Sequence, residues 1–446
     1  MSNLQLATQA LLERIGQWAA AHNADYPRLA KGLAALHGGL TSVPIELLYF
    51  GMMLLAATAI IGLFVTPLAG FSTYVERRVA ARMQARIGCN RVGPEGLLQF
   101  MADGIKLLTK EDNMPSGADP ILFRLAPYLV VLGAFMSFVC IPFGKRLYAA
   151  DFNIGLFYLI AVSSIVVVGI LLAGWSSNNK WSLLGAMRSA AQIVSYEIPL
   201  ALALMVPVLL CGSLSLQDLN HAQAGGMRNW FIAAAFPAPL IAFFVYFISA
   251  LAETNRTPFD LPEAESELVS GYNTEYSGMR WGMFYVAEYA NMILVSAITV
   301  TAFLGGWQPS RSNIFFATLA LFFAFVLGLK SLDYLGRVIG GVLQGKSIFN
   351  LLSGFRPKKF KKSTFLGVAV VSLVGAVGLS LFQDVWVVQL LMFVAKVYFF
   401  VFVIIWIRWT LPRIRIDQLM ALCWKKLVPI AFGCVLWTAT WMLIRG

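Results

Sequence analysis

Residues 253–288 read ETNRTPFDLPEAESELVSGYNTEYSGMRWGMFYVAE, and this stretch concentrates the acidic charge of the chain. Apolar runs of membrane-spanning length flank it on both sides. Carboxylates in such surroundings cost free energy unless they are paired, hydrogen-bonded or protonated. We therefore expect a functional reason for them. The stretch holds seven of the 22 acidic residues: Glu253, Asp260, Glu263, Glu265, Glu267, Glu275 and Glu288.

The composition places the chain in a lipid bilayer. Of its 446 residues, 59% are hydrophobic and 13% are charged, and the mean hydropathy is +0.73. A soluble domain could not solvate such a surface, and open strands cannot span a bilayer because their backbone groups would stay unpaired. The apolar runs lack the alternation of strands. The sequence predicts an all-α, polytopic membrane helix bundle.

The apolar runs predict about ten transmembrane helices. Residues 1–44 precede them as an N-terminal extension; they lack the apolar core of a signal peptide and fit an amphipathic surface helix. The expected spans lie near 45–75, 119–143, 151–174, 190–213, 229–252, 277–304, 312–335, 363–383, 387–409 and 426–444.

The basic residues predict the orientation of these spans. Lysine and arginine gather in and beside the loops that follow the odd-numbered spans. Cytoplasmic loops carry such an excess, so we expect the N-terminus outside. The net charge of +12 is then a sign of topology and not of nucleic-acid binding. The opposite loops and the C-terminal tail hold only Lys145, Arg146, Arg228, Arg311 and Arg445.

One motif invites a nucleotide-binding interpretation, which we reject. Residues 340–347, GGVLQGKS, match the phosphate-loop pattern GxxxxGK[ST]. Phosphate binding needs this loop between a strand and a helix. Here it falls in the loop 336–362 between two expected spans, which leaves no room for the strand and for a second, magnesium-binding strand.

Charged residues inside the spans are more informative. Glu197, Glu288 and Lys396 each lie several residues inside an expected helix. They fit a proton relay or buried ion path, with a purely structural helix–helix ion pair as the alternative.

Two acids of the opening stretch have helical spacing. Glu263 and Glu267 lie four residues apart, so on a helix they would share one face and repel each other. If water is excluded there, one carboxylate should keep its proton near neutral pH, as a proton path requires. A solvated acidic loop is the alternative.

The loop after the first span has a comparable pattern. Residues 76–106 carry Glu76, Arg77 and Arg78, a turn at 93–96, and an apolar stretch that includes Asp103 and Lys106. A membrane-surface helix would explain the stretch, and a docking surface is the alternative. The five cysteines contain no CxxC pair, and the three histidines lie outside the spans. We therefore expect no metal site and no haem or iron–sulfur ligands.

Four blocks of the sequence resemble a known family. They are ERRVAARMQARIGCNRVGPEGLLQFMADGIKLLTKED at 76–112, SYEIPLAL at 195–202, AETNRTPFDLPEAESELVSGYNTEYSGMRWGMFYVAEYANM at 252–292, and the run 395–429. Together they resemble the H subunit of bacterial NADH–quinone oxidoreductase, which is subunit 1 of mitochondrial complex I. This resemblance covers about 45–306 and 385–445.

The resemblance implies a proton-translocating membrane subunit that lines a quinone chamber and binds no cofactor itself, with FMN and iron–sulfur clusters in partner subunits. The implied partners are hydrophilic-arm quinone-site subunits, adjacent small membrane subunits, quinone and lipid, in a bacterial inner membrane. Chamber residues would be Glu76, Arg77, Arg78, Asp103, Lys106, Arg256 and Asp260. The proton path and coupling residues would be Glu197, Glu253, Glu263, Glu265, Glu267 and Glu288, with Arg256 and Arg280 as counter-charges.

The chain also departs from the family pattern. It has Cys89 where the family has proline, the N-terminal extension 1–44, and an expected insertion at 307–385 with two extra spans. This divides the chain into the extension, a membrane core 45–306 with chamber loops 76–118 and 253–276, the insertion, and the last two family helices in 386–446. Two alternatives remain: a membrane subunit of an energy-converting hydrogenase or formate hydrogenlyase, and a stand-alone ion transporter.

Overall fold

The structure, a computed structural model, describes residues 45–225, 229–262, 269–308 and 386–445. It divides into one unit that ends at Gly62 and a second from Leu63 onward, and the sites of interest lie in the second. The N-terminal extension, most of the expected insertion with the segment 340–347, and Glu263, Glu265 and Glu267 lie outside the described residues.

The described part of the chain is helical, and its only β-pairing is an isolated bridge. Short 3-10 turns at 94–96, 137–140, 231–233 and 271–273 lie between the helices. The α-helices are α3 (Ile45–Met83), α4 (Gln99–Thr109), α5 (Pro120–Met136), α6 (Gly155–Ser176), α7 (Lys180–Cys211), α8 (Leu216–Ala222), α9 (Ala238–Glu253), α11 (Gly278–Phe303), α15 (Trp386–Thr410), α16 (Ile416–Leu422) and α17 (Val428–Arg445).

This architecture confirms an all-α polytopic membrane protein. Seven of the described helices are long and apolar enough to cross a membrane, and α9 is a shorter apolar helix. Each of the eight spans expected in the described residues coincides with one of them. The segment 97–108, expected as a surface helix, is α4.

Three helix boundaries differ from the expectation. The first helix does not end before Glu76 but continues to Met83, since the alanines and arginines of 76–83 favour a helix. Helix α7 begins at Lys180, ten residues early, because the Asn179 side chain accepts a hydrogen bond from the Trp181 backbone N–H and caps it. Helix α9 begins only at Ala238, because prolines at 237 and 239 fit the first turn of a helix and not its interior.

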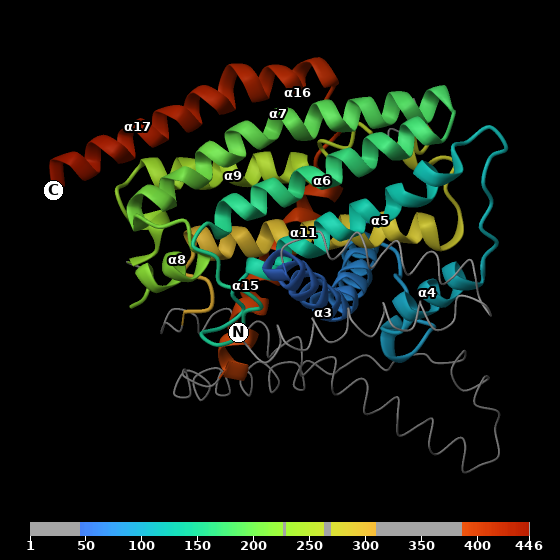
Figure 1. The fold of residues 1–446 in the computed structure, drawn as a ribbon, viewed down its shortest axis with the longest axis horizontal. Coiled ribbons are helices and arrows are strands. Elements are labelled where there is room, and N and C mark those ends of the chain that lie inside the picture. The colour runs from blue at the N-terminus through green and yellow to red at the C-terminus, as the bar shows by residue number, and fades with distance from the viewer. Residues whose placement is uncertain (1–44, 226–228, 263–268, 309–385, 446) are drawn as a thin grey trace, which may run out of the picture. The chain divides into compact units, whose positions relative to one another are not determined.

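Helix α11 forms the centre of the bundle. In its most apolar window 83% of the residues are buried, against 22% for the helix pair that ends the chain. It packs against α5, α9 and α15, while α17 packs along α7 and α9 at the outside (Figure 1). In this figure α4 lies near the start of α11, and α8 lies near its end. Charges at the two ends of α11 therefore occupy opposite ends of the bundle.

A proline inside α7 ties that helix to the end of the chain. Pro199 has no N–H, so it cannot donate to the carbonyl of Ser195 four residues earlier. The thiol of Cys423 donates to this carbonyl instead, at 3.1 Å. One residue on, the buried Tyr196 hydroxyl donates to the Leu419 carbonyl at 2.9 Å. The segment 416–427 is thus fixed to the middle of α7.

Candidate functional site

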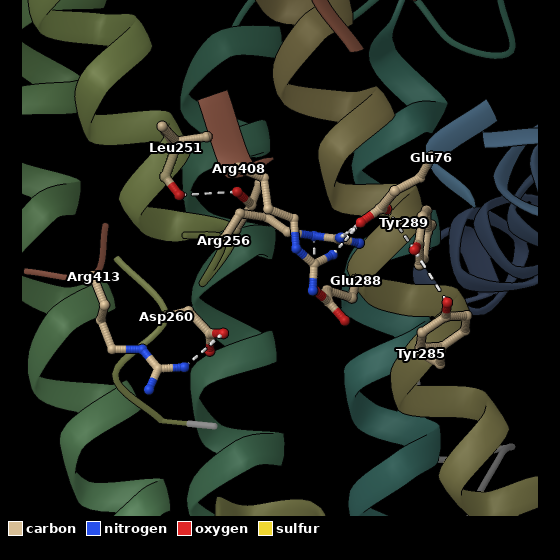
Figure 2. A network of polar contacts seen from close by, with 10 residues as sticks. Glu76, Leu251, Arg256, Asp260, Tyr285, Glu288, Tyr289, Arg408 and Arg413 are labelled. Atoms are coloured by element: carbon tan, nitrogen blue, oxygen red, sulfur yellow. Dashed lines mark hydrogen bonds and ion pairs between the residues drawn. The ribbon is translucent and has the colours of Figure 1, made fainter. Parts of the chain in front are cut away.

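A buried arginine joins two acidic side chains from distant helices. Arg256 follows the end of α9, and its side chain is 1% exposed. Its Nη1 donates to Oε2 of Glu76 at 3.0 Å, and its Nε lies 2.8 Å from Oε1 of Glu288 as an ion pair. Figure 2 shows the guanidinium between the two carboxylates. Its carbon also lies 4.3 Å from the centre of the Tyr289 ring.

The charges around Arg256 compensate one another. Arg408, in the last turn of α15, places Nη1 2.5 Å from Oε1 of Glu76. Two arginines therefore face Glu76 and Glu288. Burial opposes a charge on Arg256, but Glu288 and then Glu76 outweigh it and raise the pKa of Arg256 well above its usual value. Arg256 therefore stays charged.

Tyrosine hydroxyls extend this network. Tyr289 donates to Oε2 of Glu76 at 2.6 Å, and the hydroxyls of Tyr289 and Tyr285 lie 3.1 Å apart. Both rings stand beside the ion network in Figure 2. Because a hydroxyl can both donate and accept, this pair is a continuous hydrogen-bonded connection to Glu76.

A buried glutamine holds the loop that carries Arg256. Gln192 of α7 donates through Nε2 to the carbonyls of Ala252 at 2.8 Å and Phe259 at 2.7 Å. The same nitrogen donates to Oδ1 of Asn255 at 3.1 Å, and Asn255 has a positive φ of 51°. One side chain thus fixes the loop on both sides of Arg256.

A polar cavity opens onto the ion network. Its volume of about 430 Å³ is within the usual size range of small-molecule sites. It combines charged groups with aromatic rings, an arrangement suited to a flat molecule with polar edges. Arg256 touches three of the lining residues, Glu76, Glu288 and Tyr289, and keeps Nη2 without a hydrogen-bond partner. The lining residues are Glu76, Arg77, Ala80, Arg86, Ser270, Asn273, Trp281, Tyr285, Glu288, Tyr289, Arg408 and Trp409.

The residues expected from the first chamber loop divide into two groups. Glu76 and Arg77 line the cavity, and Asp103 of α4 is 2.6 Å from Arg77. Lys106 is largely exposed and lies 3.8 Å from Asp103. Arg78 forms a short ion pair with Glu95 in the turn that follows α3, and it is not part of the lining.

Asp260 and Arg280 are not part of the cavity lining. Asp260 is 3.4 Å from Arg413, and Ile414 N–H donates to the Pro258 carbonyl at 3.0 Å, so this loop meets the segment after α15. Arg280 was expected to balance the acidic path, but it pairs instead with Asp112, at 3.0 Å. It is placed there because the segment after α4 lies against the start of α11.

Two acids lie deeper in the bundle. Ser164 donates to Oε1 of Glu197 at 3.0 Å. Glu253 lines a small enclosed cavity of about 30 Å³, together with Ser163, Tyr246 and Asn291. This volume suffices for a water molecule, and the polar lining supplies its partners. Asn291 follows Glu288 by three residues on α11, so the small cavity lies about one turn from the ion network.

Sequence reasoning missed several residues of the site. Arg408 gave no signal, since an arginine in the last turn of an apolar span is ordinarily accommodated at the membrane interface. Tyr285 and Tyr289 lie beside Glu288 in the block 252–292. For Ser270, Asn273 and Trp409, no pattern in one sequence shows that they meet. Among the described residues, no group of three His, Cys, Asp or Glu side chains could hold a metal ion.

The fold and the buried ion network define a class: a multi-pass helical membrane protein with a charged cavity at one end of its bundle. Comparison with known proteins shows the family. A family model described as NADH dehydrogenase matches residues 55–337 and 353–439, and the chain belongs to this family. The match includes parts of the expected insertion, whose limits stay a prediction.

Three curated relatives each carry the name of the H subunit of NADH-quinone oxidoreductase. The chain is 44% identical to the one from Anaeromyxobacter dehalogenans over 394 residues, 87% of this chain and 83% of the relative. It is 42% identical to the one from Chlorobaculum parvum over 395 residues, 88% and 93% of the two chains. It is 40% identical to the one from Bacteroides thetaiotaomicron over 387 residues, which are 87% of this chain and 88% of the relative.

Proposed function

We propose that this chain is the membrane subunit of a proton-translocating NADH–quinone oxidoreductase that forms part of the quinone chamber and couples quinone reduction to proton movement. The observation that carries the proposal is the cavity of about 430 Å³ with Glu76, Glu288 and Arg408 in its lining and Arg256 behind it. The names of the relatives support the reaction.

The residues of the cavity have the chemistry that a quinone headgroup needs. Reduction of a quinone to a quinol takes up two electrons and two protons, and the oxygen atoms become transiently negative. Arg77 and Arg408 line the cavity and would stabilise that charge, and Trp281 and Tyr285 offer flat apolar surfaces for the ring. Tyr285 and Tyr289 would relay protons along their hydroxyls from the side of Glu76.

The ion network would link this chemistry to the acids deeper in the bundle. A change of charge in the cavity alters the balance between Glu76, Arg256 and Glu288, because Arg256 contacts both carboxylates. A proton that leaves Glu288 can reach the water-sized cavity beside Asn291 and Glu253, and from there Glu197. Glu263, Glu265 and Glu267 would continue the acidic path.

The proposal extends to the partner subunits of the chain and to the membrane in which it lies. Being a membrane subunit of such a complex, it has other subunits of the complex as partners; hydrophilic-arm subunits around the chamber, small membrane subunits and quinone are the specific ones that we propose. FMN and iron–sulfur clusters would belong to partner subunits. We place the complex in a bacterial inner membrane with the N-terminus of this chain outside.

The test uses the complete complex in vesicles. The Glu197→Gln and Glu263→Gln variants should lose proton pumping or coupled quinone reduction, while NADH oxidation with an artificial electron acceptor stays normal. The acceptor takes its electrons before the quinone site, so it reports intact partner subunits. Normal pumping in both variants would contradict the proposal. A complex that contains this chain but neither FMN nor clusters reducible by NADH would favour the hydrogenase alternative.

A further inference from the structure

A second buried charge lies at the opposite end of α11 from the ion network. Lys396 of α15 is fully buried, and its Nζ donates to the carbonyls of Leu304 at 3.0 Å and Gly306 at 2.9 Å. It also lies 5.0 Å from the centre of the Trp230 ring. These partners are neutral, unlike the carboxylates around Arg256. A buried ammonium without a counter-charge is poorly stabilised and readily gives up a proton.

The sequence after α11 builds the binding site for this ammonium. Gly305 and Gly306 have positive φ values of 72° and 48°, which turn the chain so that the carbonyls on both sides of Gly305 converge on Nζ. Gln223 holds the turn from the other side: Oε1 accepts from Gly305 N–H at 2.9 Å, and Nε2 donates to the Thr301 carbonyl at 2.9 Å.

Unpaired polar atoms surround this turn. Asn220 is fully buried, and both its Oδ1 and its Nδ2 lack a hydrogen-bond partner. Its carboxamide lies against Gly306, where a Cβ would have no room. Trp307 is 2% exposed and its Nε1 also lacks a partner. Buried polar groups of native proteins are satisfied by protein or by bound water, so these atoms indicate ordered water beside the Lys396 site.

An exposed histidine lies between this group and solvent. His221 of α8 meets the Trp307 ring edge to face, with the ring centres 5.5 Å apart. Asp218, the other titratable residue of α8, is exposed and accepts a hydrogen bond from Ser213, and Asp151 accepts one from Ser215 just before α8. A route from Lys396 past Asn220 and Trp307 to solvent would reach the imidazole of His221.

We propose that Lys396, Asn220 and Trp307 form a proton-release site at the end of the bundle opposite the acidic network. The ammonium of Lys396 transfers a proton to bound water, which leaves as hydronium past His221, and the neutral amine then accepts a proton from the membrane interior. The inference rests on the proposed function, to which it adds an outlet.

The proton for the neutral amine would come from the membrane interior. Ile298 of α11 is among the residues that line the water-sized cavity beside Glu253. Leu304 follows six residues later, about 9 Å along the helix axis. A helix-end clamp without proton transfer is the competing interpretation, and it predicts that only the hydrogen bonds of Lys396 matter.

The first experiment separates proton transfer from the clamp. Lys396→Gln keeps an N–H donor for the two carbonyls but carries no exchangeable charge. In vesicles that contain the whole complex, we expect fewer protons translocated per NADH, while the uncoupled rate of quinone reduction stays within about twofold. Tyr398→Phe is the matched control: Tyr398 lies on α15 like Lys396, and this variant removes its part-buried hydrogen bond to the Leu68 carbonyl of α3, so it should pump normally. A wild-type proton yield in Lys396→Gln would overturn the proposal; a wild-type complex that pumps no protons would instead overturn the proposed function.

The second experiment detects the water without relying on activity or on a Lys396 variant. In hydroxyl-radical footprinting by X-ray radiolysis, a buried side chain is oxidised efficiently when water is bound beside it. We expect Trp307 to be oxidised in the wild-type complex despite its burial, and several-fold less in Asn220→Leu. Oxidation of Trp307 that is the same in Asn220→Leu as in the wild-type complex would show that Asn220 holds no water there and would overturn the proposal.

Discussion

Glu76 and Arg408 lie 332 positions apart in the sequence, and their side chains meet at 2.5 Å. Their contact joins the end of α3 to the end of α15. Arg256 binds the other oxygen of the same carboxylate. Three separate segments of the chain thus converge on Glu76, and each has a charge that is costly to bury alone.

Replacement of Arg256 should be the most damaging single change in the network. Arg256→Met leaves the buried Glu76 and the partly buried Glu288 with one partner fewer, and loss of one member of a buried pair costs about 3–5 kcal/mol. We expect a lower thermal unfolding midpoint and little assembled complex. Arg280→Met is the control, because the Arg280–Asp112 pair is partly exposed and such pairs contribute about 0–1 kcal/mol. Equal losses in the two variants would contradict the prediction.

The hydroxyl of Tyr289 should matter for catalysis as well as for stability. Tyr289→Phe keeps the ring beside Arg256 but removes the hydrogen bond to the Glu76 carboxylate, with a stability cost of about 1.5–3 kcal/mol. We expect quinone reduction to fall at least tenfold, with NADH oxidation by an artificial acceptor unchanged. Tyr289→Leu should lose both activity and stability. Full quinone reduction in the phenylalanine variant would exclude the tyrosine from proton delivery.

Cys89 should react slowly with alkylating agents near neutral pH. Burial raises the pKa of the Cys89 thiol above its usual value, although Arg78 and Arg77 lower it in part. Because only the thiolate reacts, a raised pKa leaves less of it at pH 8 and moves the rise in reactivity to higher pH. Iodoacetamide labelling read by mass spectrometry should therefore reach half its maximal rate at a higher pH than a cysteine peptide. Cys89→Ser identifies the label, and a midpoint at or below that of the peptide would contradict the prediction.

Gly185 should be intolerant of a side chain because α7 meets the turn at 271–273 there. A Cβ on Gly185 would lie 2.7 Å from the Cα of Gly271, so the backbone must move. Overpacking of this kind costs about 1–3 kcal/mol, and here it would shift Asn273 in the cavity lining. Gly185→Ala should lower both stability and the affinity for quinone. Gly104→Ala, which meets nothing within 4 Å, is the control and should be neutral.

The sequence predicted the helices of this fold better than the tertiary contacts between them. Apolar length was sufficient for the eight described spans, since the bilayer imposes that length. It could not place Glu76 on a helix, because the alanine- and arginine-rich residues 76–83 are polar yet helical. The acids of the opening stretch were recognisable, and Glu288 does meet Arg256.

The partners of those acids were less predictable. That Arg280 would pair with Asp112, and that Arg408 would reach Glu76, depends on tertiary packing with no trace in local periodicity. The roles of the chamber and path residues stay predictions, and Glu263, Glu265 and Glu267 among them lie outside the described residues.

The hydrogen bond from Cys423 to the carbonyl that Pro199 leaves free has a consequence for the acidic path. Glu197 lies in sequence between Ser195, which supplies that carbonyl, and Pro199. The segment 416–427 therefore stabilises the backbone of α7 beside this acid. A chain cut before residue 416 would leave a bare carbonyl next to Glu197 and open it to water or lipid. The C-terminal segment from residue 416 onward is far in sequence from every acid of the path. It would nevertheless control the access of water to Glu197.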